Sequence, residues 1–256
     1  MTTKTLRVSE DTLNSWAKGP GKTEADKCEN AERVIKSAIK SSAALKDLNI
    51  SVFAQGSYGA NTNIGVESDV DICVRYDDAF FPYYPEGTDR STFGNSPSDI
   101  SFGEFKDAVH QALIDRFGRQ GVERGDKAFD VHENSYRVHA DVVATFQYRH
   151  YYSGTDGKYY FREGVAFRTD EEGKLIHNYP QQTYDNGKNR NVATSMRYKK
   201  VIRVLKNLRT EMSQDGIPVA GDFPSFLIEC LVWNVEDHIF LHDTHTERLR
   251  NVLLNL

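Results

Sequence analysis

Gln55-Gly-Ser-Tyr-Gly59 and, soon after it, Glu67-Ser-Asp-Val-Asp71 are the most informative stretches of this 256-residue chain. The preceding run Ile50-Ser-Val-Phe-Ala54 is typical of a short strand, so Gly56 and Ser57 come where that strand turns. A glycine there lets backbone N–H groups approach a phosphate, and a serine hydroxyl adds a further donor. Taken alone, however, Gly-Ser is also an ordinary turn sequence.

Two carboxylates follow, separated by one residue, in Ser68-Asp-Val-Asp-Ile-Cys-Val74. In a strand over Val70–Tyr76, Asp69 and Asp71 would face one side while the apolar residues between them face the other. Two adjacent anions raise each other's pKa unless a divalent cation or strong hydrogen bonds compensate. Asp-x-Asp by itself is also found as a surface pair on an edge strand, so the spacing alone does not assign a function.

A third acid, Asp141, interrupts the otherwise apolar strand pattern of Arg137-Val-His-Ala-Asp-Val-Val-Ala-Thr145. A carboxylate in such a strand is costly to bury unless it is paired. Together Asp69, Asp71 and Asp141 could hold two Mg²⁺ or Mn²⁺ ions. One ion would lower the pKa of an attacking hydroxyl and the other would neutralise a triphosphate and its pyrophosphate leaving group. We therefore predict a two-metal site for phosphate chemistry, with these three acids as catalytic residues.

Regular structure is predicted around these motifs. An amphipathic helix is expected over Glu24–Leu48, a long surface loop over Phe80–Ser101 and a helix over Glu104–Phe117, with Gly118 as its stop. The middle of the chain is rich in aromatic and β-branched residues, which indicates further strands. These are expected over Ala128–His132, Tyr136–Tyr151, Lys158–Arg168 and Leu175–Tyr179.

The apolar period becomes helical from Thr194 onward, and helices are expected over Phe226–Phe240 and Glu247–Leu256. The polar, turn-rich segment Pro180–Asn191 is the expected junction between two lobes. Thr244 and Glu247 have the spacing of a capping box at the last helix.

Composition limits the function. Apolar residues make up 39% and charged residues 27%, the formal net charge is −5, and no apolar run is long enough to cross a bilayer. Long nucleic acid and membranes are therefore unexpected partners, whereas a small metal-bound phosphate compound is compatible with an acidic chain. The absence of a secretory pattern at Met1–Arg7, and three scattered cysteines (Cys28, Cys73 and Cys230), favour the cytoplasm and reduced thiols.

Taken together, the motifs resemble those of the polymerase-β-like nucleotidyltransferase superfamily. Within it, Gln55-Gly-Ser-Tyr-Gly-Ala-Asn-Thr62 and Glu67-Ser-Asp-Val-Asp71 are similar to segments of bacterial cyclic-oligonucleotide synthases related to cyclic GMP–AMP synthase and oligoadenylate synthase. The similarity continues through Ile176–Gln182, Arg197–Lys206 and Pro224–Glu229. The fold that this implies is α/β (α+β): a nucleotidyltransferase core of mixed sheet and helices, residues 1–185, followed by a helical lobe, 186–256, with the active site in the cleft between them.

The resemblance implies residue roles as well. Asp69, Asp71 and Asp141 would hold the metals, and Gly56 and Ser57 the triphosphate. Further nucleotide contacts are implied for Gln55 beside the triphosphate, Lys206 on it, Ser225 on a phosphate or sugar, Phe226 stacked on a base and Asn178 reading a base edge. An asparagine amide can both donate to and accept from a pyrimidine edge, which suggests uracil.

Purely structural roles are the alternatives for several of these residues. Lys206 belongs to a basic stripe with Lys199 and Arg203 that could be a solvated helix face. Phe226 could be a core aromatic, and Asn178 could be a turn residue. Relatives generally continue beyond Leu256, so the helical lobe is expected to be shorter here.

The first functional hypothesis is synthesis of a cyclic di- or trinucleotide messenger from NTPs in antiphage signalling, with the downstream effector acting through the nucleotide product. Transfer of one nucleotide to a small molecule, an RNA end or a protein is chemically equivalent. A catalytically silent nucleotide-binding module and a glycosyltransferase fit less well, because all three acids and Gly-Ser are present. His238, His242 and His245 lack a clear further ligand for zinc.

Overall fold

The computed structural model describes residues 8–65 and 69–256, so the predictions made for Met1–Arg7, Glu67 and Ser68 lie outside the described residues. The described chain divides into two compact units. We call residues 23–59 and 69–183 the sheet unit, and residues 8–22, 60–65 and 184–256 the helical unit.

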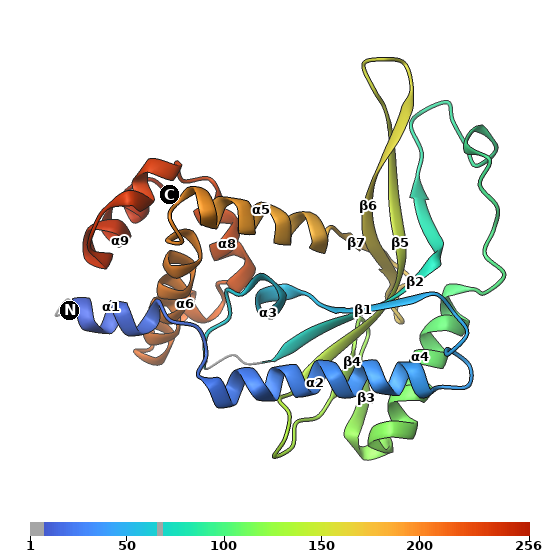
Figure 1. The fold of residues 1–256 in the computed structure, drawn as a ribbon, viewed down its shortest axis with the longest axis horizontal. Coiled ribbons are helices and arrows are strands. Elements are labelled where there is room, and N and C mark those ends of the chain that lie inside the picture. The colour runs from blue at the N-terminus through green and yellow to red at the C-terminus, as the bar shows by residue number, and fades with distance from the viewer. Residues whose placement is uncertain (1–7, 66–68) are drawn as a thin grey trace. The chain divides into compact units, whose positions relative to one another are not determined.

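The described strands form one seven-stranded mixed sheet, in which β1-β2-β5-β4-β3 are neighbours and β6 joins β5 to β7 (Figure 1). β2 and β5 run parallel to each other, whereas the other neighbouring pairs are antiparallel. This confirms the predicted mixed sheet. The strands are β1 (Ile50–Ala54), β2 (Val70–Tyr83), β3 (Val122–Arg124), β4 (Phe129–Val131), β5 (Ala140–Ser153), β6 (Tyr159–Arg168) and β7 (Leu175–Asn178).

Two helices pack on one face of this sheet, α2 (Lys22–Ser41) and α4 (Phe102–Phe117). Alternate residues of β2 and β5, such as Val70 and Val142, are fully buried against them in a single apolar cluster. Because side chains alternate along a strand, the intervening residues face the opposite side of the sheet. We call this opposite side the acid face, because Asp71 and Asp141 lie on it.

β2 is longer than predicted, because Phe80–Tyr83 continues the strand where a loop was expected. Proline was taken as a loop signal, yet Pro82 pairs in register with Arg149 of β5. β1 pairs with β2 only as far as Tyr76, so Pro82 lies on an edge of the sheet, where a missing N–H costs no ladder hydrogen bond. The register between β2 and β5 shifts between Tyr76 and Phe80, which marks a bulge.

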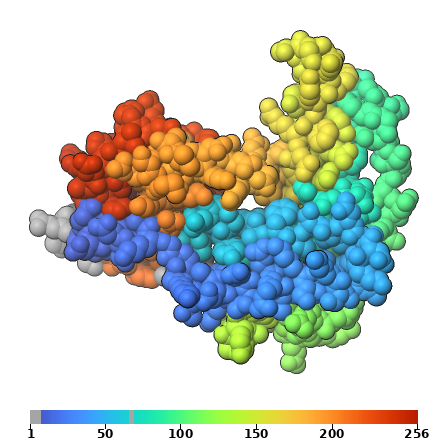
Figure 2. Space-filling view, in the orientation of Figure 1, coloured from blue at the N-terminus to red at the C-terminus, as the bar shows by residue number. Residues whose placement is uncertain are grey.

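β5 and β6 extend beyond the helices as a long hairpin whose tip stands clear of the rest of the sheet unit (Figures 1 and 2). The pairing runs from Phe146–Ala166 out to Ser153–Tyr159. Aromatic side chains near the tip are partly exposed, among them Tyr152, Tyr160 and Phe161.

The helical unit is built around α6, which contributes Ile202 and Leu205 to a core completed by the segments that follow. The predicted C-terminal helices are confirmed, although the expected helix Phe226–Phe240 is α8 and then a 3-10 turn. Thr244 caps α9, accepting a hydrogen bond from the Glu247 N–H at 3.2 Å, as predicted. The elements are α1 (Glu10–Trp16), α6 (Tyr198–Gln214), α7 (Pro218–Gly221), α8 (Ser225–Trp233), η3 (Asp237–Leu241) and α9 (His245–Leu254).

The division between the two units falls between Thr183 and Tyr184, inside the segment Pro180–Asn191 that was expected to join the lobes. The segment is the helix α5 (Pro180–Ala193), however, and not the turn-rich stretch that was expected. Proline is favoured at the first position of a helix, where its missing N–H and fixed φ cost nothing. The helix is polar along most of its length, which is why no apolar period marked it in the sequence.

α1 belongs to the helical unit, although residues 1–185 were assigned to the catalytic core. Leu13 and Ala17 pack on Val204 of α6, and the Arg203 guanidinium donates to the Ala17 carbonyl at 2.9 Å. The sequence could not show this packing, because α1 and α6 are far apart in the chain. Among the described residues, no helix is both long and apolar enough to cross a bilayer.

Candidate active site

The two halves of the central motif meet at Gly56 and Asp71. Gly56 has a φ of +59°, and a Cβ placed on it would lie 2.0 Å from the Asp71 Oδ2. The Gln55 N–H donates to the Asp71 carbonyl oxygen at 2.8 Å, which holds the end of β1 beside β2. Two independent features therefore require glycine at position 56: the backbone conformation and the carboxylate packed against its α-carbon.

Gly56 and Ser57 begin α3 (Gly56–Ala60), where the sequence had indicated only a turn. The Gly59 N–H donates to the Gln55 carbonyl at 3.0 Å, so the first helical turn closes directly after β1. Gln55 and Ser57 are half-buried at this end of the strand, next to the Asp71 backbone.

The second and third predicted acids lie side by side. Asp71 on β2 is paired in register with Asp141 on β5, and Asp141 is paired with Asp130 on β4. Residues paired in register on adjacent strands share a face, so three carboxylates form a row across the acid face. Asp69 immediately precedes β2 and is exposed.

The Asp141 carboxyl is disfavoured in its charged form. Burial raises the pKa of the Asp141 carboxyl, and the charges of Asp130 and Asp69 raise it further, against a lowering by His139. A raised carboxyl pKa means that the site disfavours further negative charge, so it would gain from a bound cation.

The donor chemistry of this row suits a hard divalent cation, because Mg²⁺ and Mn²⁺ prefer carboxylate oxygens. Within residues 8–65 and 69–256, no three His, Cys, Asp or Glu side chains are arranged to hold an ion. Metal ligation by Asp69, Asp71 and Asp141 stays a prediction.

Asp130 was missed from the sequence. Its Oδ1 lies 2.7 Å from His139 Nε2 and 3.7 Å from His132 Nε2, yet this buried oxygen has no hydrogen-bond partner of good geometry. We regard the contacts as charge proximity rather than hydrogen bonds. The available signal was Phe129-Asp-Val131, an acid between two apolar strand residues, which is the same pattern that identified Asp141.

Asn178 is the last residue of β7 and is exposed. It is paired in register with Val165 on β6, which is paired with Gln147 on β5. Gln147 follows Asp141 on β5 by six residues, an even number, so both side chains are on the acid face. Asn178 is connected to Gln147 through residues paired in register and therefore lies on the acid face as well. Asn178 is therefore a strand residue and not a turn residue, and its role in reading a base stays a prediction.

Lys206 is 1% exposed, and its ammonium group lies 2.7 Å from Glu229 Oε1. The Thr62 hydroxyl donates to the same oxygen at 2.7 Å. Lys199 and Arg203 are also buried, so the solvated helix face considered for this basic stripe is wrong. Arg203 additionally donates to the Asn61 carbonyl at 2.7 Å, which holds the segment after α3 on α6.

Ser225 is the first residue of α8 and is half-buried, and Phe226 follows it with 63% of its surface exposed. The alternative that Phe226 is a core aromatic is therefore wrong. Lys206, Ser225 and Phe226 all belong to the helical unit, whereas the other predicted site residues belong to the sheet unit.

The histidines near the C-terminus do not form a metal site. His238 lies in η3 and His242 follows it, so they do not share an α-helical face. In the part of the chain that the structure describes, neither they nor His245 join a group that could hold an ion.

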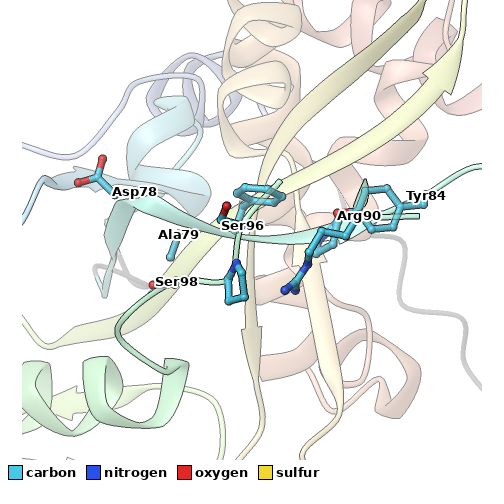
Figure 3. A pocket seen from close by; sticks show the side chains of 9 residues that line it. Asp78, Ala79, Tyr84, Arg90, Ser96 and Ser98 are labelled. Carbon is cyan, nitrogen blue, oxygen red and sulfur yellow. The ribbon is translucent and has the colours of Figure 1, made fainter. Parts of the chain in front are cut away.

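A shallow recess lies at the far end of β2 (Figure 3). It contains none of the predicted site residues. It is lined by Asp78, Ala79, Phe80, Pro82, Tyr84, Arg90, Ser96, Pro97 and Ser98.

Gly56-Ser57 after one strand of a mixed sheet, with paired acids on the two neighbouring strands, is the arrangement expected of a nucleotidyltransferase. Residues 185–256 match the family model of the cGAS/DncV-like nucleotidyltransferase C-terminal helical domain. The chain belongs to the cGAS/DncV-like nucleotidyltransferases, as its relatives show over nearly its whole length.

Two relatives are described as cyclic dipyrimidine nucleotide synthase CdnE. The protein from Cecembia lonarensis is 43% identical over 98% of this chain and 83% of its own length, and that from Legionella pneumophila is 42% identical over 95% and 82%. The solved structure of Rhodothermus marinus CdnE c-UMP-AMP synthase with Apcpp and Upnpp has a TM-score of 0.85 at 32% identity, covering 97% of this chain and 82% of that one.

Proposed function

We propose that this enzyme joins two or three NTPs into a cyclic di- or trinucleotide, releasing pyrophosphate at each step, and that uridine is among its nucleotides. One observation carries the proposal: Gly56 packs against Asp71, and Asp71 is paired in register with Asp141. Gly56, at the start of α3, is thereby held against Asp71, and the two acids share one face of the sheet. The relatives described as cyclic dipyrimidine and c-UMP-AMP synthases support this product class.

In each round, a ribose hydroxyl oxygen of one nucleotide forms a bond to the α-phosphorus of another. The bond from that phosphorus to the pyrophosphate oxygen breaks, and the hydroxyl proton leaves. A second round within the linear product closes the ring. The contribution of the protein is positioning and charge stabilisation, as is usual for phosphoryl transfer.

Asp69, Asp71 and Asp141 would hold two divalent ions, Mg²⁺ or Mn²⁺. When bound, these ions supply activation of the attacking hydroxyl and neutralisation of the leaving pyrophosphate. The backbone of Gly56 and the hydroxyl of Ser57 would bind the triphosphate beside them. The raised pKa of Asp141 supports this assignment, because burial and the nearby carboxylates disfavour its charged form and a bound cation would favour it.

The remaining contacts follow the placement of each side chain. Gln55 would touch the nucleotide beside the triphosphate, and the exposed Asn178 would read a base edge. In the helical unit, Phe226 offers an exposed ring for stacking, and Ser225 a hydroxyl at the start of α8. Lys206 would contact the triphosphate, although it is now paired with Glu229.

A cytoplasmic location, a role in antiphage signalling and a downstream effector that senses the product stay predictions. Transfer of a single nucleotide to another acceptor is the second candidate, since the same acids would serve it.

The decisive experiment is incubation of purified protein with each labelled NTP, alone and in pairs, with Mg²⁺ or Mn²⁺, followed by phosphatase treatment and mass spectrometry. We expect a phosphatase-resistant cyclic product that disappears with EDTA and in the double variant Asp69→Ala, Asp71→Ala. A labelled adduct on another acceptor would favour single transfer. Full activity in the double variant would show that the acids are wrongly assigned.

A further inference from the structure

Gln147 lies in a cross-strand row with Asn178, the residue expected to read a base. Gln147 on β5 is in register with Val165 on β6, and Val165 with Asn178 on β7. Neighbouring strands are about 4.8 Å apart, so the two amide-bearing residues are separated by roughly 10 Å across the acid face. Only the short apolar side chain of Val165 stands between them in this row.

The orientation of the Gln147 amide is fixed by Arg149. Gln147 Oε1 accepts from Arg149 Nε at 3.1 Å and from Nη2 at 3.0 Å. A guanidinium has donors but no acceptor, so the amide cannot turn its nitrogen toward it. The guanidinium is itself held, because its carbon lies 4.0 Å from the Phe80 ring centroid and 5.2 Å from that of Phe161.

The amide nitrogen of Gln147 is then left as a donor. Gln147 is only 9% exposed, and within the described residues its Nε2 has no hydrogen-bond partner. Among the described buried polar side-chain atoms, Asp130 Oδ1 lacks a partner and Gln147 Nε2 does not belong to this group, so Nε2 keeps contact with solvent. A ligand that supplies an acceptor can take the place of water there.

We propose that Gln147 is a second base-reading residue and that it selects uracil over cytosine. This inference rests on the proposed function, which brings a nucleotide base to the acid face. Uracil presents a carbonyl oxygen at the ring position where cytosine presents an amino group. The Gln147 N–H₂ donates to that carbonyl, whereas the cytosine amino group would place donor against donor.

Asn178 cannot make this choice by itself. Its side chain is exposed, and an asparagine amide can present either its oxygen or its nitrogen to a base. The Gln147 amide lacks this freedom because of Arg149. The relatives called cyclic dipyrimidine synthases leave the choice between the two pyrimidines open, and in this chain Gln147 resolves it.

The test uses Gln147→Glu, which keeps the shape of the side chain and replaces the donor by an acceptor. The ratio of kcat/KM for UTP to that for CTP, and the ratio of affinities for nonhydrolysable UTP and CTP analogues, are measured in both forms. We expect wild type to favour uridine and the variant to lower both ratios by about tenfold or more. Gln120→Glu, the same change at an exposed site in the same unit, leaves them unchanged.

Arg149→Met provides a second route that needs no new charge. Without the guanidinium the Gln147 amide can turn, so use of CTP rises while use of UTP is retained. Ratios within twofold of wild type in both the Gln147 and the Arg149 variants would overturn the inference.

The two proposals fail differently. If wild type makes a cyclic product but discriminates neither pyrimidine, the inference about Gln147 is wrong and the proposed function stands. If no NTP yields a cyclic product while the analogues bind with the expected dependence on Gln147, base reading stands and cyclic synthesis is wrong.

Discussion

The α-carbon of Gly56 lies against the carboxylate of Asp71, with room for a hydrogen atom and for nothing larger. Gly56→Ala would drive a methyl group into Asp71 Oδ2 and displace the carboxylate from the acid face. We expect activity to fall by about a hundredfold or more, the range seen when a charge-stabilising group is lost from an active site. Steady-state rates on NTPs measure the loss, and circular dichroism checks the fold.

Gly173→Ala is the matched control, because Gly173 has a φ of +62° but nothing within 4 Å of an added Cβ. Gly173→Ala introduces the backbone strain without a clash, and this strain lowers the free energy of unfolding by about 1–2 kcal/mol. Its activity should stay near that of wild type at temperatures where it is folded. Equal losses of activity in the two variants would mean that strain, not displacement of Asp71, inactivates the enzyme.

Asp141→Asn should abolish activity and yet stabilise the metal-free fold at neutral pH. Burial raises the pKa of this carboxyl, so the folded state holds its proton at a pH where the unfolded chain has lost it. Its contribution to stability is therefore present at acid pH and lost as the pH rises through the unfolded and then the folded pKa. Thermal unfolding at pH 7.5 with EDTA should show a gain of a few degrees.

Asp170→Asn should have the opposite effect. Hydrogen bonds from Arg124 lower the pKa of Asp170, burial raises it, and Lys106 lowers it further. The resulting pKa is about 2. Its stabilisation is present above the unfolded pKa and lost as the pH falls toward 2, so removing the charge lowers the melting temperature at pH 7.5. A loss of stability in Asp141→Asn as well would contradict the assigned sign.

Glu229→Gln should destabilise the protein strongly, because it leaves the ammonium group of Lys206 buried without a counter-charge. Removing one partner of a buried pair typically costs about 3–5 kcal/mol. Glu32→Gln is the control, since its pair with Lys36 is on the surface and contributes under about 1 kcal/mol. Urea unfolding compares the two, and similar midpoints would refute a structural role for the buried pair.

Phe226→Ala should leave stability within about 0.5 kcal/mol of wild type, because the ring is 63% exposed. If the ring stacks on a base, KM for NTPs rises several-fold. Phe240→Ala removes a fully buried ring from the same unit and should cost about 3–5 kcal/mol. An unchanged KM in Phe226→Ala would remove this residue from the nucleotide site.

Asn178→Ser should shift nucleotide use from uridine toward purines, since a hydroxyl shortens the side chain and no longer pairs with a pyrimidine edge. Product composition by mass spectrometry, with all four NTPs supplied, is the measurement. An unchanged composition would indicate that Asn178 does not read the base.

Local patterns predicted the strands that carry the candidate site. The strand Ile50–Ala54 has the bounds that its residues suggested. Asp71 and Asp141 lie on adjacent strands, as expected, and are paired in register. Features that depend on distant partners could not be predicted. Pro82 is tolerated in β2 only because β1 ends earlier, and Asp130 becomes relevant only once β4 is known to pair with β5.

The burial of charged side chains could not be predicted from the sequence either. The stripe containing Lys206 has the spacing of a solvated helix face, and only the positions of Glu229 and Thr62 show that it is enclosed. Helical periodicity identifies which residues share a face, but it does not say whether that face meets water.

The even spacing between Asp141 and Gln147 has a consequence for how such an enzyme can diverge. In the proposed function, substitutions at Gln147, Arg149 or Asn178 would change the base that is used without moving the acids. A single inserted or deleted residue between Asp141 and Gln147 would turn one of the two side chains toward the helices. One such change would therefore remove either the catalytic acid or the base-reading amide from the acid face. Along this strand, a new substrate preference can therefore arise by substitution of a side chain, but not by insertion or deletion of one residue.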